Sequence, residues 1–102
     1  MRRAAKVDLA QAAIVSHLLE NGWGVCLGNA IGGGAPDAFV SRLGHTAALE
    51  VKTGKRDLNE LQRKFRDKWQ GAYFVVRSPA DAEKQLNLWL LSHASLGHGK
   101  SG

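Results

Sequence analysis

Residues 34–52 read GAPDAFVSRLGHTAALEVK, and this stretch decides the fold that we predict. Residues 37–43 and 46–52 both alternate in the way typical of β-strands with one buried face. Gly44-His45 between them suits a two-residue turn with glycine at its first central position. The stretch therefore predicts a β-hairpin.

The predicted turn fixes which residues of the hairpin face one another. Phe39 then lies opposite Glu50, and Asp37 lies opposite Lys52. Asp37 and Glu50 become diagonal neighbours on the same face, roughly 7 Å apart at the backbone. The other face is apolar except for Arg42 and suits packing on a helix; it carries Ala38, Val40, Ala47, Leu49 and Val51.

The polar face of this hairpin has the groups that a divalent cation prefers. Asp37 and Glu50 would repel each other without a cation, and one of them would tend to keep its proton. Magnesium takes oxygen ligands and can polarise a phosphate while lowering the pKa of a water molecule. Lys52 beside them can neutralise charge that develops on the phosphate. The alternative is an ordinary solvated strand face with a chance Glu-x-Lys pattern.

The order of motifs resembles a known family. Gly34-Ala35-Pro36-Asp37, the hairpin, 49–52 (LEVK), 58–62 (LNELQ) and 75–78 (VVRS) together resemble the VRR-NUC branch of the PD-(D/E)xK nuclease superfamily. The resemblance runs from about residue 8 to residue 86, and its specificity lies in the ordered combination.

The resemblance implies a role for each matching residue. Asp37 and Glu50 would be metal ligands together with the backbone carbonyl of Val51, Lys52 would be the catalytic lysine, and Gln62 would be the motif glutamine on the following helix. It further implies a DNA endonuclease that depends on Mg²⁺, with Mn²⁺ able to substitute. Small stand-alone, phage-type members resemble homodimeric nucleases selective for branched DNA such as four-way junctions.

The start of the first predicted helix departs from the family pattern. The family usually has a glutamate there that reaches the metal, and the best substitute in this chain is Asp8. Asp8 can equally be the N-cap of the helix, because aspartate there accepts backbone N–H bonds, and we favour the cap. Glu20, near the other end of the helix, is a poorer candidate.

The basic residues suit a polyanionic partner. The chain has a formal charge of +5 at pH 7, and lysines and arginines near phosphates release condensed counterions. The candidates for DNA binding follow the predicted catalytic strand or decorate the next helix: Lys55, Arg56, Arg63, Lys64, Arg66 and Lys68. Each one alone is equally well interpreted as part of a solvated helix face.

Length and composition predict one α/β domain over residues 1–102. The hydrophobic fraction is 44%, and no apolar run approaches the roughly 20 residues that cross a bilayer. Nothing near Met1 is typical of a secretory signal, so we expect a cytoplasmic protein without membrane contact. Cys26 stands alone, which excludes a disulfide framework, and we interpret it as a buried strand residue.

The predicted order of elements is α-β-β-β-α-β-α, with a central mixed sheet flanked by helices. The first helix is predicted over 8–21, with Leu9, Ala12, Ala13, Leu18 and Leu19 on one side, and is followed by a strand over 23–27, a glycine-rich loop over 28–35 and the hairpin. The second helix is predicted over 59–70, with Leu61, Phe65 and Trp69 buried, and a strand follows over 72–77. The last helix begins at Ser78-Pro79 and packs through Leu86 and Leu90, with Trp89 as a further candidate. Parallel pairing is expected because a helix separates the last two strands.

Asn59 and Gln62 have the spacing of a capping box, which competes with a site role for Gln62.

Residues 92–102 are interpreted as a mobile tail. Gly99-Lys100-Ser101 within it lacks the strand and helix of a nucleotide-binding loop, so no nucleotide cofactor is expected. His17, His45, His93 and His98 lack a metal-binding spacing.

Two alternatives to a nuclease stay open. One is a catalytically weak or inactive DNA-binding module, and the other is a structural protein.

Overall fold

The computed structural model describes the backbone of residues 2–101 and the side chains of residues 9–93. Its elements are α1 (Arg2–Glu20), β1 (Gly24–Leu27), β2 (Ala38–Arg42), β3 (His45–Val51), α2 (Glu60–Lys68), β4 (Ala72–Val76) and α3 (Pro79–Ser101). The predicted order α-β-β-β-α-β-α is confirmed.

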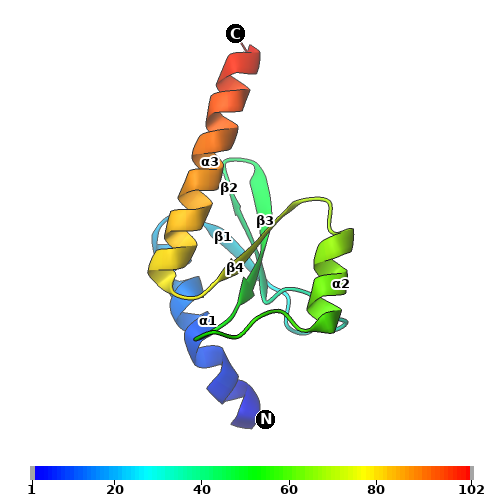
Figure 1. Cartoon of the computed structure of the whole chain (residues 1–102). Helices are drawn as coiled ribbons and strands as arrows, with labels where there is room; N and C mark the ends of the chain where they lie inside the picture. The colour runs from blue at the N-terminus through cyan, green and yellow to red at the C-terminus, as the bar shows by residue number, and fades with distance from the viewer. Residues whose placement is uncertain (1, 102) are drawn as a thin grey trace.

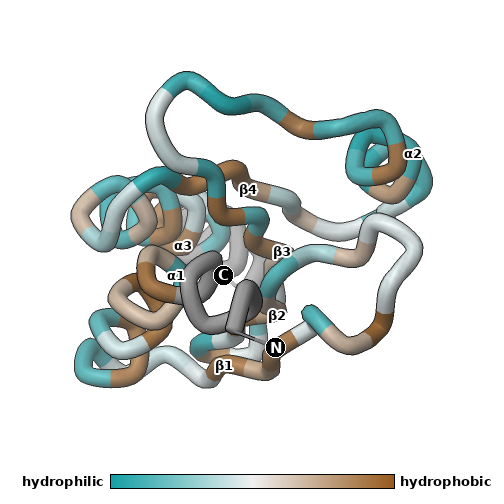
Figure 2. Tube along the Cα trace, turned by 90° about the horizontal axis from the view of Figure 1, so that it is seen from below, coloured by the Kyte–Doolittle hydropathy of each residue, from teal (hydrophilic) through white to brown (hydrophobic). Residues whose placement is uncertain are grey.

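The four strands form one mixed sheet with two differently covered faces. The strand order is β1-β2-β3-β4; β1, β2 and β3 are antiparallel neighbours, whereas β4 runs parallel to β3 after the crossover through α2. α1 and α3 lie on one side of the sheet and α2 lies on the other, as the views from the side (Figure 1) and from below (Figure 2) both show. The predicted parallel pairing is therefore confirmed.

The hairpin turn lies one residue earlier than predicted. Arg42 pairs with His45, so Leu43 and Gly44 are the central residues, with φ of 53° and 84°. Two positive φ values are typical of a type I′ turn, whose twist matches that of the flanking strands. The predicted Gly44-His45 turn is wrong because Gly44 takes the second central position.

The correct register shifts the pairing by two residues and therefore keeps both faces. Ala38 faces Leu49, and Val40 faces Ala47. All four residues are at most 2% exposed, so the predicted apolar face is confirmed. Val40, Ala47 and Leu49 form one core cluster with buried residues of the two helices on that side, among them Ile14, Leu18 and Leu86. Val51, Trp89 and Leu90 are partly buried and pack against this cluster.

The first helix differs from its prediction in length and in buried side. α1 starts at Arg2, so Asp8 lies inside the helix and the N-cap interpretation is wrong; the Asp8 side chain lies outside the described residues. The buried stripe is Gln11, Ile14 and Leu18, whereas Leu9 and Leu19 are 72% and 54% exposed. Residues 11, 14 and 18 follow the helical repeat, and Leu19 is turned away from that line.

Three smaller expectations also change. Cys26 is exposed on β1, rather than buried. Its neighbour Val25 points to the opposite face of the strand and packs against the core, so the Cys26 side chain points away from the core. α2 ends at Lys68, and Leu61 is 57% exposed while Phe65 and Trp69 are half-buried. α3 continues through Ser101, past the start of the predicted tail at residue 92. The predicted mobility of residues 92–102 stays a prediction, and the side chains after residue 93 lie outside the described residues.

Ser78 and Pro79 begin α3 as predicted. The Ser78 hydroxyl accepts a hydrogen bond from the backbone N–H of Asp81 at 3.0 Å, and Pro79 occupies the first helical position, where its missing N–H costs nothing.

Across residues 2–101, none of the helices combines the length and the hydrophobicity that a membrane span requires.

Candidate functional site

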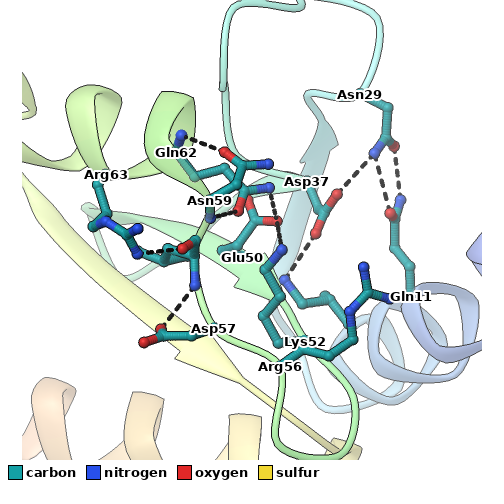
Figure 3. Close-up of polar contacts among 12 residues, drawn as sticks. Gln11, Asn29, Asp37, Glu50, Lys52, Arg56, Asp57, Asn59, Gln62 and Arg63 are labelled. Atoms are coloured by element: carbon teal, nitrogen blue, oxygen red, sulfur yellow. Dashed lines mark hydrogen bonds and ion pairs between the residues drawn. The ribbon is translucent and has the colours of Figure 1, made fainter.

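A cleft of about 450 Å³ lies where β2 begins and β3 ends, between α1 and the start of α2. Side chains from these four elements point toward one another there (Figure 3). The lining residues are Leu9, Ala10, Gln11, Asp37, Glu50, Val51, Lys52, Thr53, Arg56 and Gln62. The four residues predicted to be catalytic all belong to this set.

Asp37 and Glu50 form the centre of the cleft. Continuing the β2–β3 register by one residue from Ala38 and Leu49 places Asp37 directly opposite Glu50, rather than diagonal to it as predicted. Directly opposite positions have Cβ atoms about 4.5–5.5 Å apart. The corrected register therefore brings the two carboxyl groups closer together than the sequence interpretation did.

The surroundings of Glu50 favour its neutral form. Its side chain is only 3% exposed, and this burial is the main reason that its pKa is raised from 4.5 to about 8. The negative charge of Asp37 raises the pKa further, whereas the positive charge of Lys52 lowers it. Without a cation, Glu50 therefore carries a proton at neutral pH.

The two oxygens of Glu50 have different partners. Oε2 accepts a hydrogen bond from Gln62 Nε2 at 2.9 Å and lies 3.9 Å from Lys52 Nζ. Among the described atoms, Oε1 is buried and has no hydrogen-bond partner. Buried acceptors in native proteins are nearly always satisfied, so an unpaired one at a cleft indicates a place for an ion or ligand.

Asp37 is held from two sides. Its Oδ2 accepts a hydrogen bond from the backbone N–H of Val51 at 2.8 Å, and its Oδ1 accepts one from Asn29 Nδ2 at 3.0 Å. Asn29 is in turn fixed by two hydrogen bonds with the side chain of Gln11, at 2.8 and 3.1 Å. Gln11 is 6% exposed. A chain of three polar side chains thus links α1 to the cleft carboxylate.

The backbone carbonyl of Val51 is free of its expected ladder partner. Lys52 donates its N–H to Val76 on β4, so the N–H and carbonyl of Val51 point the opposite way, toward β2. The same register continued by one more residue places Pro36 opposite Val51, and proline has no N–H to donate. This carbonyl therefore faces the cleft as a third possible oxygen ligand.

Gln62 forms the predicted capping box and also contacts Glu50. Its backbone N–H donates to Asn59 Oδ1, and its own Oε1 accepts from the Asn59 N–H, each at 2.9 Å. These two bonds complete the predicted capping box of α2. Its remaining Nε2 donates to Glu50. The cap therefore fixes the side chain that holds Glu50.

The predicted DNA-binding residues are divided between the cleft and the surface. Arg56 lines the cleft, and Lys55 is exposed beside it. Arg63 is engaged in holding the loop before α2, because its guanidinium donates to the carbonyl of Leu58. Lys64 and Arg66 lie on the outer side of α2 in exposed ion pairs with Glu60 and Asp67. The cleft itself therefore contains Lys52 and Arg56 as its cations.

Four residues at or around the cleft were not predicted from the sequence. Gln11 and Asn29 hold Asp37, and Arg77 donates to the carbonyls of Gly54 and Arg56 at 3.1 and 2.7 Å, which fixes the Arg56 loop. Tyr73 has a buried hydroxyl without a partner among the described atoms; burial, and then the Glu50 charge, raise its pKa to about 12. Tyr73 pairs with Ala48, so strand alternation alone could have placed it on the Glu50 face.

The donor set suits a hard cation. Two carboxyl groups, one of which has an unpaired oxygen, and one free carbonyl supply oxygen ligands of the kind that Mg²⁺ and Mn²⁺ take. Within the part of the chain whose side chains are described, no group of three or more His, Cys, Asp and Glu residues converges.

Neither a protein-family model, nor a curated protein, nor a solved structure matches this chain.

Proposed function

We propose that this protein is a metal-dependent DNA endonuclease that hydrolyses phosphodiester bonds at the cleft of Asp37, Glu50 and Lys52. The observation that carries the proposal is the direct opposition of Asp37 and Glu50, with a buried, unpaired Glu50 oxygen and the Lys52 ammonium group 3.9 Å from the other oxygen. Two opposed carboxyl groups in a buried place are costly unless a cation joins them.

The residues that would hold the metal are Asp37, Glu50 and the carbonyl of Val51. Their oxygen donors fit Mg²⁺, and Mn²⁺ is expected to substitute. When bound, such an ion supplies Lewis acidity toward a phosphate oxygen and lowers the pKa of a water molecule. Asp8, the fourth predicted ligand, lies on α1 with its side chain outside the described residues.

The neighbouring side chains would orient and neutralise the reacting groups. Lys52 is 11% exposed, so its charge acts in a poorly solvated place where attraction to a phosphate is strengthened. Gln62 keeps Glu50 in position through a hydrogen bond that α2's cap has already oriented. Arg56, on a loop fixed by Arg77, supplies a second cation at the mouth of the cleft.

The resemblance to the VRR-NUC branch of the PD-(D/E)xK superfamily gives the proposal its substrate. Such nucleases are expected to act on branched DNA, including four-way junctions, as homodimers whose two sites make paired cuts. A dimer is tested by the mass of the protein in solution with and without a junction. A species that stays monomeric with the junction bound would contradict this part of the proposal.

A DNA-binding module with weak or no catalysis is the second candidate. The observation that favours it is that the described residues of α1 line the cleft with the neutral amide of Gln11 and with Leu9 and Ala10, and none of these three is a carboxylate. A site with one carboxylate fewer binds a divalent cation less tightly. Such a module would bind branched DNA with steep salt dependence and leave it intact.

Cleavage of labelled DNA tests the two candidates against each other. Four-way junction, flap and linear duplex are incubated with wild type, Lys52→Ala and Lys84→Ala, in Mg²⁺, in Mn²⁺ and in chelator. Lys84 is the matched control because it is exposed on α3, across the sheet from α2. The nuclease proposal expects metal-dependent cutting that Lys52→Ala abolishes and Lys84→Ala retains. Binding without cutting by folded wild type would favour the module instead.

A further inference from the structure

A second groove lies beside the cleft, between α2 and the glycine-rich loop that precedes β2. It encloses about 420 Å³ and is lined by Gly33, Leu61, Lys64, Phe65, Lys68 and Trp69. Leu61 precedes Gln62, which contacts Glu50. With a rise of 1.5 Å per helical residue, the groove extends from the cleft to about 10 Å along α2. One strand of DNA can therefore reach both places.

The floor of this groove is aromatic and rigid. The rings of Phe65 and Trp69 are stacked, with centroids 5.6 Å apart and an interplanar angle of 24°. Trp69 donates its indole N–H to the carbonyl of Ala72 at 2.9 Å, which fixes the orientation of the ring. Both side chains are only half-buried, and part of each therefore faces the groove.

The rim of the groove is cationic. Lys64 and Lys68 lie one helical turn apart and are exposed. The nearest acidic partner of Lys64 is Glu60, at 3.8 Å, and both side chains of this pair are more than 60% exposed. Exposed pairs of this kind are weak, so a phosphate can replace Glu60 as the partner of Lys64.

The glycine loop closes the groove from the other side. Gly34 is pressed against α2, since a Cβ there would lie 2.4 Å from the carbonyl oxygen of Leu61. Gly33 and Gly32, in contrast, have no atom within 4 Å of such a Cβ. The loop is therefore anchored at one point and open at its tip, where a ligand can approach the backbone closely.

We propose that this groove binds an unpaired nucleobase of DNA, which stacks on Phe65 and Trp69 while adjacent phosphates contact Lys64 and Lys68. This inference rests on the proposed function, because it assumes DNA at the neighbouring cleft. Aromatic rings beside cations match a flat base flanked by phosphates, whereas a paired base is buried in its own stack. The groove thereby selects DNA with unpaired bases near the cut.

The test compares binding of two DNA probes in chelator, where no cleavage occurs. One is a fully paired duplex, and the other is the same duplex with one unpaired 5-iodouracil. Trp69→Leu removes the stacking ring, Lys68→Gln removes a rim charge, and Lys84→Gln makes the same charge change on the exposed side of α3. Thermal melts check that each variant is folded.

The inference expects Trp69→Leu to weaken binding of the unpaired probe by about tenfold or more while the paired duplex binds as in wild type. Lys68→Gln should weaken both probes and reduce the salt slope by about 1, and Lys84→Gln should change neither. If folded Trp69→Leu binds both probes like wild type, the groove proposal is overturned.

Photocrosslinking of wild type gives a result that does not depend on any variant. Light-induced adducts of the 5-iodouracil with Phe65 or Trp69, located by mass spectrometry, support the inference, and their absence from saturated complexes overturns it even if Trp69→Leu fails to fold. Wild type that binds neither probe would overturn the proposed function as well. Wild type that binds and cleaves DNA without these adducts would overturn the groove alone.

Discussion

Replacing Glu50 with glutamine should remove most of the pH dependence of stability in the metal-free protein. The amide resembles the protonated carboxyl, because it has nearly the same shape and can accept from Gln62 in the same buried place. It differs in one respect, since it cannot ionise as the pH rises. The comparison of Glu50→Gln with wild type therefore isolates the cost of charging Glu50.

The sign follows from the raised pKa. Because the folded-state pKa of about 8 lies above the ordinary 4.5, the folded protein binds this proton more tightly than the unfolded chain between those values. The resulting stabilisation is complete below about pH 4.5 and is lost as the pH rises through 8. At 1.36 kcal/mol per pKa unit, the loss is at most roughly 5 kcal/mol. Domains of this size have a total free energy of unfolding of about 5–15 kcal/mol.

Urea unfolding in chelator at pH 5, 7 and 9 measures this difference. The free energy of unfolding of Glu50→Gln, relative to wild type, should increase by a few kcal/mol from pH 5 to pH 9. Added Mg²⁺ should restore wild type at pH 9, because it binds the ionised carboxylate of the folded state, and should have much less effect on Glu50→Gln. Parallel pH curves for the two proteins would refute the reasoning, and equal stabilisation by Mg²⁺ would remove Glu50 from the ligand set.

Two further predictions concern the support of the site and the hairpin turn. Asn29→Ala removes a hydrogen bond to the Asp37 carboxylate and should weaken Mn²⁺ binding by about 10- to 100-fold in isothermal titration. The control Asn87→Ala, at an exposed position on α3, should leave the Mn²⁺ affinity unchanged. If Asn29→Ala and wild type bind Mn²⁺ equally well, Asn29 does not position Asp37. Leu43→Asn should stabilise the protein by about 1 kcal/mol in thermal or urea unfolding, because Leu43 is 80% exposed at a φ of 53° and asparagine tolerates this conformation. A less stable Leu43→Asn protein would mean that the Leu43 side chain makes a stabilising contact despite its exposure.

The fold could be predicted where periodicity was strong. Alternation in residues 37–52 identified both strands and both faces, and Ser78-Pro79 marked the start of α3. The buried side of α1 could not be predicted in the same way, because alanine and leucine occur all around that helix and none of its faces dominates. Gln11 is buried there through its bonds to Asn29, and a contact between residues 18 positions apart leaves no local pattern.

The candidate site was predicted more completely than the turn that builds it, and the period of a strand explains why. Gly44 is compatible with either central position of a two-residue turn, so the sequence did not decide between the two registers. They differ by two residues, and a shift of two keeps every side chain on its face. Asp37, Glu50 and Lys52 therefore stay together in both.

The correct register changes the chemistry, since it moves Asp37 and Glu50 from diagonal to directly opposite positions. Closer approach raises the cost of ionising both carboxyl groups, and the charge of Asp37 thus adds to burial, the main cause, in raising the pKa of Glu50. The position of a single glycine in a turn thus sets how strongly the two carboxyl groups at the end of this hairpin are coupled, and a divalent ion can stabilise the coupled pair.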